Sequence, residues 1–426
     1  MRSVFHQKAE VRDAALRRIE LRGKTDVVAG LIRFLRYSYE TKAVVKTLER
    51  ITGAKPGPEW SDWMLWQEAN PDIPVFEGHD GFLADRMARI DDKFRLFLQR
   101  GVKHEIRLEE ITWGGVVKDG IPALTNPDLV SPDDELAAYL KPDELVFGVS
   151  INGDTRAYPL RFLDWHEMFN DVIGGKPVSL AYCTLCGSGI LFETTVKGRE
   201  KPFVFGSSGF LYRSNKLMYD KETNSLWNQF TGRPVVGPLT GSGIELKILP
   251  VVITSWEKWY KKNPDSKVLS EHTGYYRDYR PGRPYSEYFN SPELMFPALV
   301  RDKRLAPKDY VFAVRALGPD GKWAEKAWPV TDFNGFTVIN DTVGKTPVVL
   351  IGDAGSRTVR AFESGDKTFK AVGADGVLGP GGTWQVTETA LTGPDGQSLK
   401  RLPGHIAYWF AWQGYKPKAP YGVAKK

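Results

Sequence analysis

Both cysteines of this chain lie in one short segment, LAYCTLCGSGILFE at residues 180–193. A disulfide that supports a fold normally joins distant segments, whereas a Cys-x-x-Cys pair is typical of a metal knuckle or a redox dithiol. The flanking runs VSLAYC and SGILFETTV have the composition of strands, so Cys183 and Cys186 are predicted to occupy the turn between them. In a thioredoxin-type site the pair would begin a helix, and no helical pattern follows Cys186. The turn therefore favours a metal knuckle.

A mononuclear metal site needs a third ligand, and His166 is the best candidate. It lies in LDWHEMF, on a predicted short helix just before the two strands. The alternative is a core histidine on a Trp- and Phe-rich helix. Two thiolates and one imidazole with a weak fourth position suit copper, our first choice, or catalytic zinc. If His405 or an acid completed four ligands, a structural zinc would be favoured.

Several other polar side chains could surround these ligands or line a pocket beside them: Glu167, Asp119, Arg213, Asp220, Arg277 and Tyr279. Arginines and tyrosines together can bind an anionic group through charge-assisted hydrogen bonds. The alternative is a loop packed on the body by cation–π contacts. Walker, dinucleotide-binding and G-x-S-x-G patterns are absent from the sequence, so no catalytic residue or substrate is assigned.

The chain divides into three regions by periodicity. Residues 1–55 have the 3.6-residue apolar spacing of helices, resembling one or two HEAT-type hairpins, and GAKPGPEW is a linker. Residues 56–104 form a second helical, Trp-rich stretch, predicted to connect to the body and pack on it. From residue 105 to about 420, short β runs alternate with Gly, Pro, Asn and Asp. The predicted fold is α+β, a β-rich body with a small helical N-terminal appendage.

The β-rich region contains an internal repeat, over about 146–260 and 311–412. Asn170-Asp171 matches Asn340-Asp341 at an offset of 170 residues, and LPVVITSWEKW matches LPGHIAYWFAW at an offset of 153. We therefore predict two pseudo-symmetric halves with short helices. At the offset of 170, Cys183, Cys186 and His166 align with Asp353, Ser356 and Phe336. The second copy keeps the matching Asn-Asp and Leu-Pro positions but lacks the candidate ligands. This favours a site in the first copy. The alternative is a structural metal replaced by apolar packing.

The charge of the chain is concentrated at its start. Residues 1–60 hold 13 Lys/Arg and 7 Asp/Glu, which accounts for the whole net charge of +6. A nucleic-acid enzyme would carry its basic surface on the main domain, so a nucleic-acid partner is not expected. The basic helices are either a solvated face or a contact surface for an anionic membrane or an acidic partner. The oligomeric state is not predicted.

From about residue 105 to 415 the sequence resembles an uncharacterised, mostly bacterial family, domain of unknown function 3179. The motifs that carry the resemblance are DGIPAL, RAYPLRFLDWHEMFND, AYCTLCGSG, SGFLYRSNKLMYDKETNSLWNQFTG, VLSEHTGYYRDY and HIAYWFAW. Where family members usually have Pro after the first cysteine, this chain has Thr184. The resemblance implies an exported, periplasmic or otherwise extracytoplasmic protein, although no apolar leader begins this sequence.

Taken together, these features predict a metal-binding protein with a Cys183, Cys186 and His166 site for copper or zinc, which would suit an extracytoplasmic oxidoreductase. Two alternatives stay open. One is a metal-free thiol–disulfide protein that uses the same cysteines. The other is a peptide- or glycan-binding or assembly module without catalysis.

Overall fold

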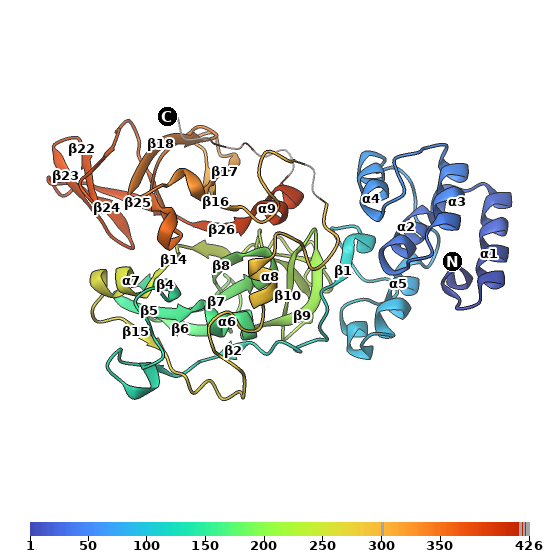
Figure 1. Ribbon diagram of the computed structural model, residues 1–426, viewed down its shortest axis with the longest axis horizontal. Coiled ribbons are helices and arrows are strands. Elements are labelled where there is room, and N and C mark those ends of the chain that lie inside the picture. Colours follow the sequence, from blue (N-terminus) through green and yellow to red (C-terminus); the bar gives the residue numbers. More distant parts are fainter. Residues whose placement is uncertain (300–301, 417–419, 421, 423–426) are drawn as a thin grey trace.

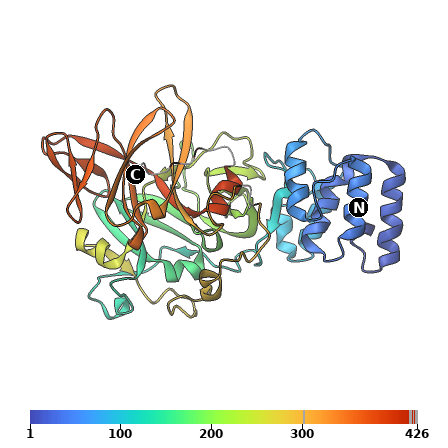
Figure 2. The same cartoon turned by 45° about the horizontal axis from the view of Figure 1, so that its top comes forward.

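The computed structural model describes residues 1–299, 302–416, 420 and 422. Helices gather at one end of the molecule and a β-rich body forms the other (Figures 1 and 2). The N-terminal helices are α1 (Ala9–Arg22), α2 (Val28–Tyr37), α3 (Lys42–Thr52), α4 (Trp60–Ala69) and α5 (His79–Ala88). The predicted fold class, α+β with a helical N-terminal region, is confirmed. In the described part of the chain, no helix combines the length and the apolar character needed to cross a bilayer.

The N-terminal helices follow from their apolar spacing. Leu31, Ile32 and Leu35 of α2 are buried against the neighbouring helices. Gly53 ends α3 in the left-handed conformation, with φ of 71°, as the sequence predicts for a C-terminal cap. Along α1, Arg17 and Arg18 are exposed. The contact of this basic face with an anionic membrane or an acidic partner stays a prediction.

The helical part is joined to the body mainly by α5 and the short 3-10 helix that follows it. Phe82 and Met87 of α5, together with Phe94, share one core cluster with Phe210 and Tyr212 of the body. Within the Trp-rich stretch, Trp63 and Met64 pack among the helices instead. The connection therefore uses the end of the 56–104 region more than its tryptophans.

Three five-stranded sheets are built mainly from the first copy of the repeat. The first has the order β1 (Ile111–Trp113), β9 (Phe205–Tyr212), β10 (Asn215–Asp220), β11 (Leu226–Asn228) and β12 (Arg233–Val236). The second has the order β13 (Lys247–Leu249), β8 (Ser188–Glu193), β7 (Lys176–Cys183), β6 (Met168–Ile173) and β2 (Leu124–Thr125). The third has the order β14 (Val252–Ser255), β4 (Leu145–Ile151), β5 (Asp154–Pro159), β15 (Lys267–Leu269) and β3 (Leu129–Val130). Helix α6 (Leu160–His166) joins β5 to β6, and α7 (Trp256–Lys262) follows β14.

The second copy supplies two further sheets. A three-stranded sheet has the order β17 (Trp323–Pro329), β16 (Tyr310–Leu317) and β26 (Gly404–Tyr408). An eight-stranded sheet has the order β18 (Thr337–Val343), β19 (Thr346–Asp353), β20 (Thr358–Glu363), β25 (Ser398–Leu402), β24 (Ala390–Thr392), β23 (Gly382–Val386), β22 (Gly376–Gly379) and β21 (Lys370–Val372). Helix α8 (Ser286–Asn290) lies between the copies in sequence, and α9 (Trp409–Tyr415) follows β26. The largest core cluster takes buried side chains from both copies, so they form one body.

The offsets found in the sequence recur as matching elements. Strands β6, β7 and β8 correspond to β18, β19 and β20, and the β14–α7 unit corresponds to β26–α9. Asn170 bonds both the N–H and the carbonyl of Phe205, at 2.8 and 2.9 Å. Asn340 bonds the same two groups of Phe369, at 2.9 and 2.8 Å. The paired asparagines therefore fasten a following segment to the sheet in each copy.

The two asparagines give a matched test of this role. Asn170→Ala is expected to lower the free energy of unfolding by about 3 kcal/mol, because it leaves a buried amide and carbonyl without partners. Asn340→Ala should cost about 1 kcal/mol, because water can replace its bonds at an exposed position. Urea unfolding of both variants checks the difference. Equal losses would show that burial does not set the cost.

Candidate functional site

The two cysteines are bonded to each other in the turn where the sequence places them. Strand β7 ends at Cys183, a 3-10 turn covers Thr184–Cys186, and β8 begins directly after Gly187. The two sulfurs form a disulfide, with the Cα atoms 5.2 Å apart. Gly187 has φ of 60°, which glycine adopts at little cost, and a Cβ there would lie 2.8 Å from the ring of Tyr310. The turn is therefore closely packed against the second copy.

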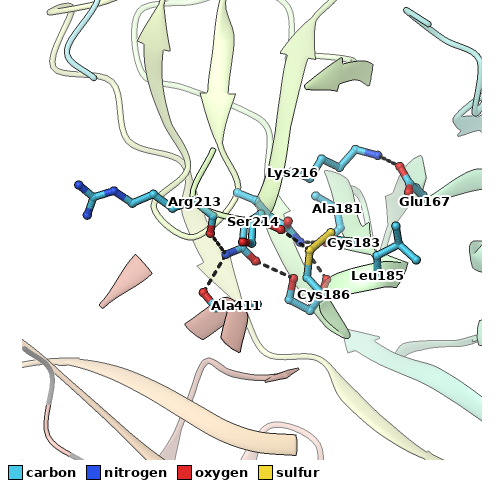
Figure 3. The surroundings of a disulfide bond; sticks show 12 residues. Glu167, Ala181, Cys183, Leu185, Cys186, Arg213, Ser214, Lys216 and Ala411 are labelled. Carbon is cyan, nitrogen blue, oxygen red and sulfur yellow. Dashed lines mark hydrogen bonds and ion pairs between the residues drawn. A yellow bond between two sulfur atoms is a disulfide. The ribbon is translucent and has the colours of Figure 1, made fainter. Parts of the chain in front are cut away.

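The disulfide is buried in an aromatic cluster. Cys183 is 3% exposed and Cys186 is 0% exposed. The side chains packed around them include Leu211, Tyr288, Tyr408 and Phe410. On one side, Cys186 Sγ lies 2.7 Å from the carbonyl oxygen of Ser214, in the turn between β9 and β10 (Figure 3). This turn is fixed by Asn215, whose amide donates to the carbonyl of Ala411 at 2.9 Å.

A buried ion pair lies near the same turn. Glu167 ends α6 with φ of 54°, a conformation uncommon for a residue with a side chain. Its carboxylate pairs with the ammonium of Lys216, which is 3% exposed and also donates to Ser207 Oγ at 3.1 Å. Figure 3 shows the Lys216 ammonium directed at Glu167 and away from the disulfide. The carbonyl of Glu167 accepts from the N–H of Tyr182 at 2.7 Å, which links the ion pair to the strand that carries Cys183.

His166 lies on α6, as predicted, but both of its ring nitrogens face oxygen atoms. Nδ1 is 2.8 Å from the carbonyl of Pro122, which can only accept, so Nδ1 carries the proton. Nε2 therefore accepts from the hydroxyl of Tyr279 at 2.6 Å, and that hydroxyl accepts from Thr273 Oγ1 at 2.6 Å. Burial lowers the pKa of His166 to about 4, so the imidazole is neutral at neutral pH.

This histidine gives a pH-dependent prediction. In the unfolded chain the pKa is 6.5, so the unfolded state binds a proton first as the pH falls. The contribution of His166 is therefore complete above pH 6.5 and is lost as the pH falls through about 4, an effect of about 3 kcal/mol. Urea unfolding between pH 7 and 4 should show a shallower loss of stability in His166→Gln. The matched control is His6→Gln at an exposed site. An unchanged slope in His166→Gln would contradict the assignment.

The predicted site of two cysteines and one histidine stays a prediction. Within the described residues, the structure holds no group of three or more His, Cys, Asp or Glu side chains placed to bind a metal. Copper or zinc at Cys183 and Cys186 would require the disulfide to be reduced first. His166 would also have to release either Pro122 or Tyr279.

Of the predicted surrounding residues, Tyr279 and Glu167 do flank His166. Asp119 and Arg277 instead interact with other side chains. Asp119 accepts from the hydroxyl of Tyr219 at 2.6 Å and pairs with Lys118 at 2.9 Å. Arg277 lies 5.7 Å above the ring of Trp165, the cation–π packing weighed as an alternative.

Three predicted residues are held in other structural interactions. Arg213 pairs with Glu110 at 2.7 Å, and its side chain points away from the disulfide (Figure 3). Asp220 accepts from the indole N–H of Trp227 at 2.9 Å and supports a tight turn. His405 is half-buried beside the ring of Phe230, its Nε2 finds no hydrogen-bond partner among the described residues, and burial of the ring lowers its pKa to about 3. Among the described residues, no hydrogen bond or ion pair joins these three side chains to the cysteines.

Other residues near the disulfide are missed by the sequence analysis. Ser214 and Tyr288 reach the turn from segments far along the chain, and Lys216 pairs with Glu167 beside it. Asp164 is also buried, one carboxylate oxygen has no partner in the described part of the chain, and burial raises its pKa despite a hydrogen bond from Tyr182. A lysine within the apolar strand NKLMYD is the one available signal, because such a residue is rarely buried without a partner.

Comparison with known proteins gives one result. A search of curated proteins and a search of solved structures both return no match. A family model described as "Protein of unknown function (DUF3179)" matches residues 118–419. The match covers the β-rich body from residue 118 on, including the cysteine turn, and leaves out β1 and the N-terminal helices. The chain therefore belongs to the DUF3179 family of proteins of unknown function.

Proposed function

We propose that Cys183 and Cys186 are a redox-active pair and that the protein carries out thiol–disulfide exchange. The observation that carries the proposal is the second copy of the repeat. There, β19 and β20 are joined by the same kind of 3-10 turn, Ala354–Ser356, without any cysteine. Asp353 caps that turn by accepting from the N–H of Gly355 at 2.8 Å. A turn that forms without a disulfide does not require one, which supports a functional use for the bond.

The small size of the loop points the same way. A disulfide stabilises a fold chiefly by restricting the unfolded chain, and the effect grows with the number of residues enclosed. For a pair separated by 3 positions this amounts to about 2 kcal/mol, against about 5 kcal/mol for a loop of 100 residues. The bond therefore adds little to the stability of a fold of 426 residues.

We infer different roles for the two sulfurs from their surroundings. In the reduced protein, the thiol of Cys186 would donate to the carbonyl of Ser214, which favours the protonated form. Cys183 Sγ has no such acceptor within the described part of the chain, and Cys183 is the more exposed of the two cysteines, at 3% against 0%. Cys183 is therefore the sulfur that exchanges with an external thiol, and Cys186 is the resolving sulfur.

The reaction is balanced as two successive exchanges. An external thiolate attacks Cys183 Sγ, the bond to Cys186 breaks, and Cys186 leaves as a thiolate that takes up a proton. A second external thiol then attacks the mixed disulfide and releases Cys183. Two external thiols are oxidised to a disulfide while the protein pair is reduced to two thiols. The reverse sequence oxidises a dithiol partner.

Metal binding is the second candidate, and it applies to the reduced protein. Two thiolates from one turn can face one ion, and neutral His166 lies on the preceding helix. Copper remains the first choice and zinc the second. Replacing either cysteine by Ser should then abolish tight binding, and His166→Ala should weaken it less.

Equilibration in glutathione redox buffers tests the proposal. Folded protein should titrate reversibly between zero and two free thiols, counted by alkylation and mass measurement. A pair that stays oxidised at every potential at which the protein is folded would refute the exchange function. Adding Cu⁺ or Zn²⁺ to the reduced protein tests the second candidate. A sulfur-to-metal absorption band for copper, or displacement of a zinc-sensitive dye, would support it, and their absence would refute it.

A further inference from the structure

One segment that packs over the cysteine turn is residues 283–299, which we call the strap. It contains helix α8 and otherwise runs as turns and extended chain. Tyr288 belongs to the same buried cluster as both cysteines. Five partly buried side chains of the strap pack against this cluster: Tyr285, Phe289, Leu294, Phe296 and Ala298. Because Cys183 is 3% exposed and Cys186 is 0% exposed, an external thiol cannot approach their sulfurs while this cluster is intact.

At the turn itself, the strap is fastened through Tyr288. The Tyr288 hydroxyl donates to the carbonyl of Leu185 at 2.6 Å, and Leu185 lies between the two cysteines. Burial raises the pKa of Tyr288, so the phenol keeps its proton and remains a donor. The ammonium of Lys308 lies 3.7 Å above the Tyr288 ring and donates to the carbonyl of Ser291 at 2.6 Å. These polar contacts therefore add to the aromatic packing that holds the strap over the disulfide.

The far end of the strap is held by the N-terminal helices. Arg36 of α2 donates to the carbonyl of Pro297 at 2.7 Å. Leu299 is buried in the core cluster of the helices, at 7% exposure. The strap residues Phe296 and Pro297, with Trp60 of α4, border a cavity of only about 20 Å³, so this junction is almost filled. One segment thus contacts both the disulfide and the helices that lie outside the matched family region.

We propose that the strap is a cover that must lift before Cys183 can exchange, and that the N-terminal helices are its latch. The inference rests on the proposed thiol–disulfide function. A change at the helices that loosens Leu299 or the Arg36 bond raises the fraction of molecules with an open strap. The rate of exchange is then set by the helical segment, although that segment contributes no group to the sulfurs.

The rate of reduction by dithiothreitol, followed by alkylation and mass measurement, tests the latch. In the unmodified protein the rate should level off at high dithiothreitol, where strap opening becomes limiting. Tyr288→Phe removes the bond to Leu185, and Arg36→Ala removes the bond to Pro297, so each should speed reduction about tenfold at low dithiothreitol. Arg50→Ala is the matched control, because it breaks an exposed pair with Glu20 within the helices and leaves the strap alone.

Three outcomes distinguish a failure of the proposed latch from a failure of the proposed thiol–disulfide exchange. Faster reduction in both strap variants, with Arg50→Ala unchanged, supports the latch. Unchanged rates in Tyr288→Phe and Arg36→Ala, with reversible reduction of the folded protein, overturn the latch and leave the exchange function standing. Reduction that coincides with loss of the near-ultraviolet circular dichroism shows that the pair opens only on unfolding, and it overturns both. Arg36→Ala keeps the test valid if Tyr288→Phe does not fold, because Arg36 acts from outside the aromatic cluster.

Discussion

Cys186→Ser is expected to accumulate a mixed disulfide between Cys183 and glutathione, whereas Cys183→Ser is expected to form none. With Cys186 removed, no neighbouring thiol can displace the glutathione from Cys183. Release then depends on a second external thiol, which should lengthen the life of the adduct on the order of a thousandfold relative to the intact pair. With Cys183 removed, the remaining sulfur is fully buried and lies against the carbonyl of Ser214. Intact mass measurement after incubation with oxidised glutathione checks both variants.

The controls follow from the repeat. Ser356 occupies the position of Cys186 in the second copy, so Ser356→Ala alters the matching turn without touching sulfur. It should leave the adduct unformed and the redox titration unchanged. Both cysteine variants should keep a single cooperative thermal transition, since the second copy builds its turn without the bond. Equal adduct yields from the two cysteine variants would contradict the assigned roles, and unfolded variants would contradict the claim that the turn needs no disulfide.

The elements around the cysteines follow from local sequence, and the sequence predicts them correctly. Short apolar runs bounded by turn residues mark β7 and β8, and the helix with His166 begins directly after Pro159. The repeat can also be recognised in the sequence, because Asn170 and Asn340 make the same backbone hydrogen bonds in the two copies. These features depend on neighbours within a few residues or on a pattern that occurs twice.

The partners of the cysteines could not be predicted in this way. The atoms that decide between a metal ligand and a redox sulfur belong to segments distant in sequence, such as the Ser214 carbonyl and the Tyr279 hydroxyl on His166. A backbone carbonyl carries no residue-type signal at all. The strap has no periodicity, since its one helix has five residues, so nothing in its sequence indicates that it covers the turn. The proposed function therefore rests on contacts between segments that are distant in sequence, and local sequence patterns do not predict such contacts.

Glu388→Gln is expected to cause a large loss of stability, about 3–5 kcal/mol, in the second copy. Glu388 is 7% exposed and accepts from Arg360 and Arg401, each at 2.6 Å. Arg401 also donates to the carbonyl of Val251, in the first copy, at 3.2 Å, so the cluster ties the two copies together. A glutamine leaves two buried guanidinium groups without a counter-charge and turns amide hydrogens toward them. Urea unfolding at pH 7 measures the loss.

The matched control for this variant is Glu363→Gln on the same sheet. Glu363 pairs with Lys400 at 3.3 Å, but its side chain is 43% exposed and that of Lys400 is 74% exposed. Exposed pairs of this kind contribute about 0–1 kcal/mol, so the same chemical change should cost little. A loss in Glu363→Gln equal to that in Glu388→Gln would show that burial of the charges is not the cause.

The pH dependence of Glu388→Gln separates lost charge from lost packing. Burial opposes ionisation of Glu388, but Arg360 and Arg401 outweigh it and lower the pKa from 4.5 to about 2. Since the folded pKa is the lower one, the contribution of the carboxylate is complete above pH 4.5 and is lost as the pH falls toward 2. The difference in stability between the natural protein and Glu388→Gln should therefore shrink between those two values. A difference that stays constant down to pH 2.5 would mean that the glutamine disturbs packing alone, and the two arginines would then not depend on Glu388 for their charge balance.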